Sequence, residues 1–502
     1  MSERPSEPRS MIFHWAATEP GRRAAVENDV TFSYGELASG ILYLRDAFAA
    51  MGLAPGSLAA VDVSSPLDNR LVLFALRALG IDVAPVHHAS YIPELLQKPK
   101  AFLVLSAIET RSGIREAPKD CEDRVVLAPA DLRQEMRRPR DPSAGPILLT
   151  GRHSVFSSGT TGRAKRVAFD SEYENRLHDH RAEQLGFSAS TVIDCGAMGP
   201  WGVGGFRFPN CVWHIGGVAV FDNRAGQRRD IHAHGLTHFY TVPTALARFA
   251  HSWPAELRRA DDVTILVAGG PVSTPVINAV TEKITRQIIN VWGCSETTKH
   301  PMQRRFNGDP YELNWLDPVP GTTTELLRED GTPAAPGEAG IMRYLSEAGG
   351  VTRYEDDGEA TARQFRDGAF YPGDLAVRRA DGRIRFAGRD DDVLNVKGIK
   401  TPARPIEARL IDELAVDDVC IFVGLDDSGA EILVVCIEST QRVPKDALRT
   451  AAQHLAKQGK VAFSLHQAFP RGANGMGKVI RRHLRAEAFE RLGMSEGAPT
   501  EV

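Results

Sequence analysis

Residues 154–169 read SVFSSGTTGRAKRVAF, and this stretch decides how the rest of the sequence is interpreted. A run of hydroxyl side chains bracketed by glycines ends at Lys165, and a β-like VAF segment follows it. Glycines let backbone N–H groups approach the oxygens of a polyphosphate, and hydroxyl and ammonium groups bind the same oxygens. The stretch is therefore a candidate phosphate loop, although it lacks the Gly-Lys-Ser/Thr ending of the Walker pattern. A polar surface turn is the alternative, and only partner residues elsewhere in the chain distinguish the two.

The composition is typical of a soluble globular protein. Of the 502 residues, 42% are hydrophobic and 25% are charged, which is enough for about three domains. Lys and Arg number 60 against 64 Asp and Glu, and the net charge of −4 gives no basis for a nucleic-acid partner or an anionic membrane. The six cysteines form no CxxC pair, which argues against a zinc site and a disulfide framework. Because long apolar runs and an export segment are both missing, we expect a cytoplasmic protein without a membrane partner.

Most of the chain alternates between strand-like and helix-like segments. This alternation runs through residues 34–106 and 235–292, and it favours parallel βαβ layering. Residues 108–146 are polar and contain prolines, so we expect an irregular segment there. From Thr322 onward the turn-bounded segments predict antiparallel strands, with Asp330-Gly331 and Asp381-Gly382 as hairpin turns. Three successive acids at 390–392 mark a shift in composition, and we place a domain boundary there.

Three passages are candidate binding edges. Gly269 and Gly270 follow an apolar strand, and ligands bind at the carboxyl ends of parallel strands. Residues 287–298 (QIINVWGCSETT) lead from a short strand into a loop with an aromatic, a hydroxyl and a carboxylate. Residues 191–208 (TVIDCGAMGPWGVGGFRF) are dense in glycine, which permits close approach of the backbone to a ligand or another element. An irregular buried loop is the alternative for that last passage.

Five segments in fixed order resemble the AMP-forming adenylating superfamily, which includes acyl- and aryl-CoA synthetases, stand-alone and peptide-synthetase adenylation domains, and luciferases. Each segment alone is modest support, but their order and spacing across most of the chain make chance similarity a poor explanation. They are similar to the family patterns (S/T)SGTTGxPK, GGP, YGxTE, YxTGD to GRxDDxIK, and PRxxxGK. In this chain they read SSGTTGRAK (157–165), GGP (269–271), VWGCSETT (291–298), YPGDLAVRRADGRIRFAGRDDDVLNVKGIK (371–400) and PRGANGMGK (470–478).

The residue types suit the activation of a carboxylate by ATP. A carboxylate oxygen must approach an α-phosphate that is itself anionic, so cations and donors must screen the phosphates and align the reactants. The resemblance implies that the first segment cradles the β- and γ-phosphates and that the second also binds ATP. These residues are Ser157, Ser158, Gly159, Thr160, Thr161, Gly162, Lys165, Gly269, Gly270 and Pro271.

The resemblance also implies roles for the next two segments. Trp292 matches the aromatic residue that stacks on adenine, and Ser295 lies near the α-phosphate. Glu296 matches the Mg²⁺ ligand, and a carboxylate suits that hard cation. Asp374 matches the aspartate that binds both ribose hydroxyls, and Arg389 matches the arginine beside it.

Two further positions are implied to act in the small C-terminal part. Lys478 matches the lysine that bridges the substrate carboxylate and the α-phosphate, so it is the main catalytic prediction, together with Ser295 and Glu296. Asp391 falls on the hinge about which that part swings between the two half-reactions. A solvated acidic turn is the alternative for Asp391.

Pattern and resemblance together predict a mixed α/β fold in two domains. We expect a large N-terminal domain of layered sheets with flanking helices, which binds ATP and the acid, over residues 1–389. A hinge at 390–391 joins it to a small mobile α+β domain over 392–492, and a disordered tail follows over 493–502.

The family places the acid pocket near residues 194–206, the 268–271 edge and the loop after Trp292. Met198, Trp201, Phe206 and Gly293 predict a mostly apolar slot for an aromatic or medium-sized apolar acid. Asp194 and Asp222 are the candidate aspartates for binding an α-amino acid, but neither lies in the sequence pattern that peptide synthetases use for this purpose.

The sequence departs from the family pattern at several places. Ala164 replaces a proline in the phosphate loop and Pro372 replaces a threonine, whereas Asn395 and Pro405 replace a lysine and an acid of the small domain. About two extra residues also separate Pro470-Arg471 from Gly477-Lys478. These changes leave the adenylation step intact, and they concentrate in the part that shapes the second half-reaction.

The sequence therefore predicts an ATP- and Mg²⁺-dependent ligase that converts a small carboxylic acid to an acyl-adenylate. Coenzyme A is the expected acceptor of the acyl group. The alternatives are a stand-alone enzyme that loads a carrier protein or acylates an amine or other nucleophile, and an inactive nucleotide-binding protein.

Overall fold

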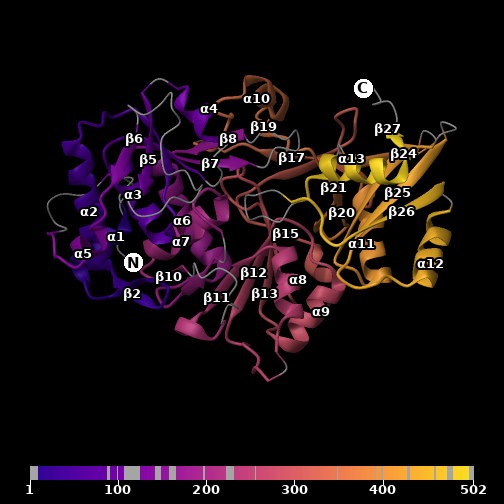
Figure 1. The fold of residues 1–502 in the computed structure, drawn as a ribbon, viewed down its shortest axis with the longest axis horizontal. Coiled ribbons are helices and arrows are strands. Elements are labelled where there is room, and N and C mark those ends of the chain that lie inside the picture. The colour runs from indigo at the N-terminus through magenta and orange to yellow at the C-terminus, as the bar shows by residue number, and fades with distance from the viewer. Residues whose placement is uncertain are drawn as a thin grey trace.

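The computed structural model describes residues 10–86, 91–98, 100–106, 125–141, 148–157, 165–195, 198–221, 231–254, 256–347, 349–389, 392–396, 399–426, 430–456, 459–471 and 479–496. It has a mixed α/β architecture in which several sheets are layered with helices, and the C-terminal strands and helices form a smaller group at one end (Figure 1). The predicted fold class is therefore confirmed. Within the described ranges, none of the helices combines the length and apolarity that crossing a membrane requires.

A six-stranded sheet carries the phosphate-loop candidate at its edge. Its order is β6-β5-β3-β4-β7-β8, and all neighbours are parallel except the last pair, β7 and β8. The strands are β3 (Leu58–Asp62), β4 (Asp82–Pro85), β5 (Ala101–Ser106), β6 (Val125–Ala128), β7 (His153–Ser157) and β8 (Lys165–Phe169).

A nine-stranded sheet forms the second layer, in the order β15-β14-β13-β12-β11-β9-β10-β1-β2. Its six central strands are parallel, as the alternating sequence pattern predicts, and antiparallel strands close both ends. The strands are β1 (Arg23–Glu27), β2 (Val30–Ser33), β9 (Val192–Asp194), β10 (Val218–Phe221), β11 (His238–Thr241), β12 (Thr264–Ala268), β13 (Ile288–Trp292), β14 (Met302–Arg305) and β15 (Asp317–Pro318).

Helices lie between and around these two sheets. Helix α2 packs on β1 and β2 of the nine-stranded sheet, α3 packs on β3 and β4 of the six-stranded sheet, and α2 contacts α3. The helices of this part of the chain are α1 (Met11–Thr18), α2 (Tyr34–Ala50), α3 (Pro66–Ala78), α4 (Ile92–Leu96), α5 (Leu132–Met136), α6 (Ser171–Leu185), α7 (Val203–His214), α8 (Pro243–His251), α9 (Thr274–Lys283) and α10 (Gly358–Gln364).

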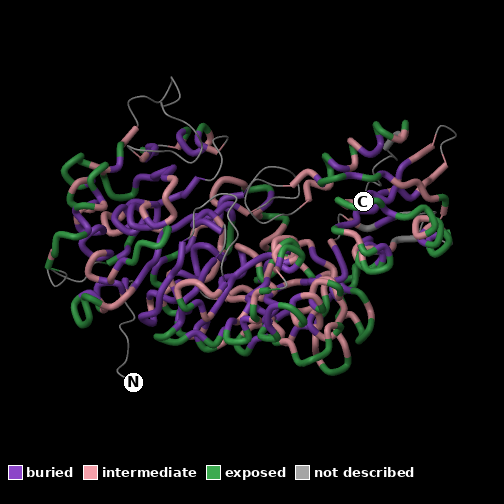
Figure 2. The backbone as a smooth tube through the Cα atoms, turned by 60° about the horizontal axis from the view of Figure 1, so that its bottom comes forward, coloured by how far each residue is buried: buried purple, intermediate pink, exposed green. Residues whose placement is uncertain are grey.

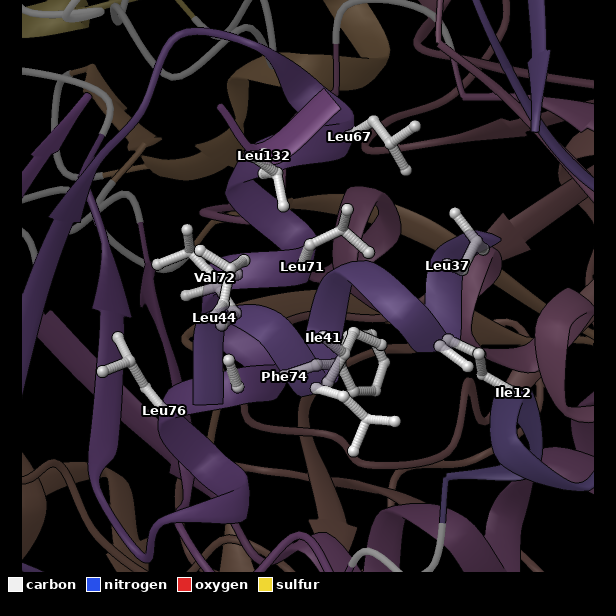
Figure 3. Packing of buried hydrophobic residues seen from close by; sticks show 14 of the residues in the cluster. Ile12, Leu37, Ile41, Leu44, Leu67, Leu71, Val72, Phe74, Leu76 and Leu132 are labelled. Carbon is white, nitrogen blue, oxygen red and sulfur yellow. The ribbon is translucent and has the colours of Figure 1, made fainter. Parts of the chain in front are cut away.

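One hydrophobic core joins the two sheets through α2 and α3. Leu37, Ile41 and Leu44 of α2 lie beside Leu71 and Phe74 of α3 in this core (Figure 3). Local signals in the sequence mark the start of both helices. Ser33 and Glu36 form a capping box at α2, and Ser65 caps α3 with Pro66 in its first turn.

An antiparallel sheet follows, as the two Asp-Gly turns predict. Its order is β18-β19-β17-β20-β21, with β16 paired to β17. The strands are β16 (Thr324–Leu327), β17 (Ala339–Leu345), β18 (Phe365–Arg366), β19 (Ala369–Phe370), β20 (Asp374–Arg378) and β21 (Ile384–Arg389).

The C-terminal part builds its own core. Its buried side chains form two clusters within residues 394–489, whereas the remaining clusters all lie within residues 12–384. The described strands here pair as β22-β23 and β26-β25-β24-β27. The elements are β22 (Val393–Val396), β23 (Ile399–Pro402), β24 (Asp418–Leu425), β25 (Glu431–Glu438), β26 (Lys460–His466), β27 (Ser495–Glu496), α11 (Ala403–Leu414), α12 (Lys445–Leu455) and α13 (Arg481–Leu492).

Three sequence expectations need correction. The irregular segment predicted over 108–146 is wrong for β6, which pairs with β5, and for α5, which packs on α2. The disordered tail predicted over 493–502 is wrong for β27, which pairs with the end of β24. The irregular loop considered for residues 191–208 is wrong from Val203, where α7 begins. Each of these segments is too short or too rich in glycine for a local pattern, and tertiary contacts order it.

The glycines of α7 serve close packing. A Cβ on Gly204 would lie 2.5 Å from the Tyr240 ring, and one on Gly205 would lie 2.2 Å from the carbonyl oxygen of Gly199. Side chains at these two positions would push α7 away from β11 and from the chain that precedes it. Of the two roles expected for these glycines, the structure therefore shows close approach to another element.

Leu71→Ala is expected to destabilise the protein, because Leu71 is fully buried in the core between the sheets. Such a truncation costs ~2–5 kcal/mol through lost burial and a residual cavity. Buried stretches of chain run through the interior of the large part, whereas exposed stretches lie mostly at its outer side (Figure 2). The matched control is Leu127→Ala on β6, since Leu127 is 56% exposed. Urea-induced unfolding followed by circular dichroism compares the two variants, and equal losses would contradict this view of the core.

Candidate active site

The candidate phosphate loop connects two paired strands. In the antiparallel register of β7 and β8, Ser157 lies directly opposite Lys165. The loop residues between them, Ser158, Gly159, Thr160, Thr161 and Gly162, lie outside the described residues. The strands nevertheless fix the two ends of the loop, so Lys165 occupies a defined position at the edge of the six-stranded sheet.

The Lys165 side chain is buried and hydrogen-bonded. Its Nζ donates to Gln364 Oε1 at 2.7 Å and lies 4.9 Å from the centroid of the Tyr354 ring. Burial lowers the pKa of Lys165, and the Glu296 carboxylate opposes that shift. Lys165 and Glu296 are therefore electrostatic neighbours, although they come from different sheets.

Glu296 lies in the loop that leaves the carboxyl end of β13. Its carboxylate is buried, and its Oε1 accepts a 2.8 Å hydrogen bond from the Tyr354 hydroxyl. Within the loop, Thr297 Oγ1 accepts from the Cys294 N–H at 3.1 Å and donates to the Cys294 carbonyl at 3.1 Å. This tight turn fixes the backbone on either side of Glu296.

A buried cluster of charged side chains is hydrogen-bonded to the same loop. Glu174 on α6 pairs with Arg181 at 3.0 Å and with Arg207 at 3.1 Å. The guanidiniums also donate to the loop, Arg181 to the Thr298 carbonyl at 2.7 Å and Arg207 to the Thr297 carbonyl at 2.9 Å. Burial opposes ionisation of Glu174, but the two guanidiniums outweigh it, and the pKa of Glu174 is lowered.

Asp374 is buried at the start of β20 in the antiparallel sheet. It lies opposite Arg389 in the β20–β21 register, and their charged groups are 3.0 Å apart. Burial raises the pKa of the Cys294 thiol, and the Glu296 and Asp374 carboxylates raise it further. The Cys294 thiol therefore lies within electrostatic range of both carboxylates.

The glycine edge and Trp292 lie on neighbouring parallel strands. Ala268, the last residue of β12, is in register with Val291 of β13, so Gly269 and Trp292 follow at adjacent strand ends. Gly269 has φ +99°, a conformation that favours glycine. Pro271 is exposed and Gly270 is half-buried. This edge is the carboxyl end of the sheet, where the sequence predicts binding.

The four predicted pocket residues lie in different surroundings. Met198 and Trp201 are buried, and Met198 packs in a cluster that includes Tyr240. Phe206 stacks on His153, with ring centroids 3.7 Å apart, and belongs to a separate cluster with Tyr354. Gly293 is exposed beside Ser295, which is half-buried.

The predicted hinge Asp391 and the predicted catalytic Lys478 both lie outside the described residues. Their roles therefore remain sequence-based predictions.

The residues around Glu296 fit a Mg²⁺ site that is completed by water and phosphate oxygens, rather than a metal site built from protein ligands alone. In the described part of the chain, no group of three or more His, Cys, Asp or Glu side chains could hold a metal ion. Mg²⁺ binds through one or two carboxylates, retained waters and substrate phosphates. The buried carboxylate of Glu296, a neighbour of Lys165, suits such a site.

A family model described as AMP-binding enzyme matches residues 12–348, which is more than half of the chain. The chain belongs to this family. The family match and the relatives described below together support an AMP-forming acid ligase.

Curated relatives of this AMP-binding enzyme differ in length and product. The 4-chlorobenzoate–CoA ligase of an Arthrobacter species is 24% identical over 510 residues, covering 94% of each chain. Novobiocin biosynthesis protein H of Streptomyces niveus is 27% identical, covering 81% of this chain and 70% of the relative. Malpinin synthetase of Mortierella alpina is 26% identical over 87% of this chain, but the chain spans only 6% of that protein.

Solved structures share the whole fold of the AMP-binding enzyme. The o-succinylbenzoate coenzyme A synthetase of Bacillus subtilis, in complex with ATP and a magnesium ion, has a TM-score of 0.79 at 19% identity, covering 95% and 99% of the two chains. An anthranilate CoA ligase in complex with anthranoyl-AMP has a TM-score of 0.79 at 19% identity, covering 98% and 99%. An amide bond synthetase of Marinactinospora thermotolerans has a TM-score of 0.77 at 17% identity, covering 95% and 99%.

Several residues of the site were missed by sequence analysis. Tyr354 and Gln364 lie in a segment without a recognisable pattern. Glu174 and Arg181 are seven residues apart on the polar helix α6, a spacing that puts both on one face, and their burial could have been suspected from it. Arg207 stands out as a charge within an apolar, glycine-rich passage, and this was the strongest available signal.

Glu174→Gln is expected to destabilise the AMP-binding enzyme strongly, because it leaves two buried guanidiniums without their carboxylate. Breaking a buried pair in this way costs ~3–5 kcal/mol. The matched control is Glu172→Gln on the same helix, where Glu172 forms an exposed pair with Arg176, worth below about 1 kcal/mol. Chemical denaturation at pH 7 measures both, and a similar small loss in the two variants would contradict the role of the cluster.

The Glu174 variant also has a defined pH dependence. The folded-state pKa of Glu174 is lowered, so its charge stabilises the fold fully above the unfolded-state pKa of about 4.3. That contribution is lost as the pH falls through the lowered folded-state pKa. The stability difference between wild type and Glu174→Gln should therefore be largest near neutral pH and narrow in acid, and a difference that widened in acid would contradict the assignment.

Proposed function

We propose that this AMP-binding enzyme uses ATP to convert a small carboxylic acid to an acyl-adenylate and pyrophosphate, and then transfers the acyl group to the thiol of coenzyme A. One observation carries the proposal. Lys165 and Glu296, which come from different parts of the chain, are joined through Gln364 and Tyr354 near the carboxyl end of β13, and the charge of Asp374 acts on Cys294 in the same loop.

The proposed roles of these residues in ATP binding follow from this arrangement and from the family patterns. Lys165 and residues 157–162 bind the β- and γ-phosphates, Asp374 binds the ribose, and Trp292 stacks on adenine. Gly269, Gly270 and Pro271 line the nucleotide site, and Arg389 orients Asp374 through its ion pair. Glu296 would hold Mg²⁺, which supplies charge neutralisation at the phosphates when it is bound.

In the first step, a carboxylate oxygen of the acid attacks the α-phosphorus, and the bond to the bridging oxygen of pyrophosphate breaks. Lys478 contacts the carboxylate and the α-phosphate and stabilises the charge that spreads in the transition state, with Ser295 close to the same phosphate. In the second step, the thiol gives its proton to solvent and its sulfur attacks the acyl carbon. The bond between that carbon and the phosphate oxygen breaks, and AMP leaves. Asp391 is the hinge between these two arrangements of the small domain.

An aromatic acid is the substrate class we propose. Met198 and Trp201 are buried apolar side chains near the end of β9, Phe206 is a buried residue in the first turn of α7, and Gly293 is exposed in the loop after Trp292. Two relatives are named for aromatic acids, 4-chlorobenzoate and anthranilate. ATP, coenzyme A and the reduced cysteines of the described chain suit a cytoplasmic location.

A different acceptor is the alternative that has specific support. The family departures at Asn395 and Pro405 and the lengthened segment before Lys478 all fall in the small domain. The relatives include an amide bond synthetase and peptide synthetases, whose names indicate amide products. An amine or a carrier-protein thiol would then replace coenzyme A in the second step.

A pyrophosphate-release assay with a panel of acids tests the first step. We expect release with benzoate-type acids to exceed release with short-chain aliphatic acids and α-amino acids. Adding coenzyme A, a phosphopantetheinylated carrier or an amine and identifying the product by mass spectrometry then separates the acceptors. If no acid in the panel increases pyrophosphate release above the level without acid, the adenylation function is refuted. An inactive nucleotide-binding protein would then be supported.

Lys478→Ala should reduce adenylate formation by at least about a hundredfold, as expected for loss of a charge that acts in the transition state. ATP binding should change little, because other residues hold the nucleotide. Lys460→Ala is the matched control, since Lys460 is an exposed lysine of the same domain that pairs only weakly, at 3.4 Å, with Asp426. Near-normal adenylation in Lys478→Ala would refute the catalytic assignment.

A further inference from the structure

The strongest feature that the nucleotide roles do not use is a hydrogen-bonded chain between Lys165 and Glu296. Lys165 Nζ donates to Gln364 Oε1 at 2.7 Å, the Tyr354 hydroxyl lies 2.7 Å from that same oxygen, and it lies 2.8 Å from Glu296 Oε1. Tyr354 is buried, so its hydroxyl works in a poorly solvated position. The chain connects an ammonium and a carboxylate that the sequence separates widely.

We propose that Tyr354 is a positioning residue that couples metal binding at Glu296 to phosphate binding at Lys165, through Gln364. This inference rests on the proposed function, which assigns the metal to Glu296 and the phosphates to Lys165. It adds that the two sites fill together rather than independently.

The coupling follows from the number of protons and acceptors. A phenol has one proton, and both neighbours of the Tyr354 hydroxyl are acceptor oxygens, so it donates to only one of them at a time. While Lys165 donates to Gln364, the amide oxygen already has a donor, and the phenol donates to Glu296. When a phosphate draws Lys165 away, Gln364 needs a donor, and the phenol proton turns toward it.

That turn has a consequence for Glu296. A carboxylate oxygen that no longer accepts from Tyr354 has both of its lone pairs, and more of its negative charge, available for a cation. Phosphate binding at Lys165 therefore favours metal binding at Glu296, and the reverse must hold to the same degree, because coupling between two binding equilibria is reciprocal.

The backbone around Tyr354 is built to hold this position. The Tyr354 N–H donates to Thr361 Oγ1 at 3.0 Å, at the start of the segment that α10 completes. The following residues are tied to β8, because the Glu355 N–H donates to the Arg166 carbonyl at 3.0 Å and Arg166 pairs with Asp356 at 2.7 Å. The segment thus follows the strand on which Lys165 lies.

The Tyr354 ring also packs in the hydrophobic core, so the test needs a variant that keeps the ring. It belongs to the cluster with Phe169 and Phe206, and it contacts Phe365 edge-on at 5.3 Å. Tyr354→Phe keeps this packing and removes only the hydroxyl. The matched control is Tyr34→Phe, because Tyr34 is also fully buried and its hydroxyl donates at 2.7 Å to the Gly217 carbonyl, a contact that the coupling does not involve.

The test measures ATP binding without catalysis. The dissociation constant of ATP is determined by calorimetry in the absence of an acid substrate, once with EDTA and once with saturating Mg²⁺. The ratio of the two constants is the coupling. We expect Tyr354→Phe and Gln364→Leu each to lower this ratio at least about fivefold, the double variant to lower it no further, and Tyr34→Phe to leave it at the wild-type value.

The outcomes separate this inference from the function on which it rests. A Tyr354→Phe enzyme with the wild-type ratio would overturn the coupling, and so would equal weakening of ATP binding with and without Mg²⁺, since that is the mark of a purely structural role. A wild-type enzyme whose ATP affinity does not depend on Mg²⁺ would overturn the metal role of Glu296 and the coupling with it.

Discussion

The site depends first on the carboxylate of Glu174 between two buried guanidiniums. Three charges removed from water are costly unless each is paired and hydrogen-bonded. Arg181 and Arg207 meet this condition by dividing their donors between Glu174 and the carbonyls of Thr298 and Thr297. The same hydrogen bonds that satisfy the charges therefore lock α6, α7 and the loop after β13 into one arrangement, and the position of Glu296 follows from it.

Strand register supplies the rest of the alignment. Antiparallel pairing sets Ser157 opposite Lys165 on one sheet and Asp374 opposite Arg389 on another. The segment between Tyr354 and Gln364 hydrogen-bonds to both Lys165 and Glu296, so it links the first of these pairs to the loop after β13. Strands hold Lys165, Asp374 and Arg389, and the shorter segment between Tyr354 and Gln364 links Lys165 to Glu296 through side-chain hydrogen bonds. Such a division leaves the link as the part that can respond to a ligand.

The chain has separate hydrophobic cores on the two sides of residues 390–391, as the two proposed half-reactions would require. Buried side chains on either side of residues 390–391 pack within their own part, so no apolar cluster of the described chain opposes a change in the relation between the parts. Domains joined in this way are expected to move more readily than one with a continuous core. Of the departures from the family pattern, Asn395, Pro405 and the lengthened segment before Lys478 fall in the small part, which is where we propose that the acceptor is chosen.

The sequence by itself determined the α/β class, most helices and strands of the large part, the antiparallel hairpins and the family. These features arise from local patterns: caps such as Ser33, apolar spacing, Asp-Gly turns and ordered motifs. Only the tertiary structure decided the roles of Glu174, Arg207, Tyr354 and Gln364. It also decided that β6 pairs with β5 and that β27 pairs with β24. The physical reason is that a buried polar group is stabilised by partners far away in the chain, and an edge strand by its neighbour, so neither leaves a periodic signal in its own residues.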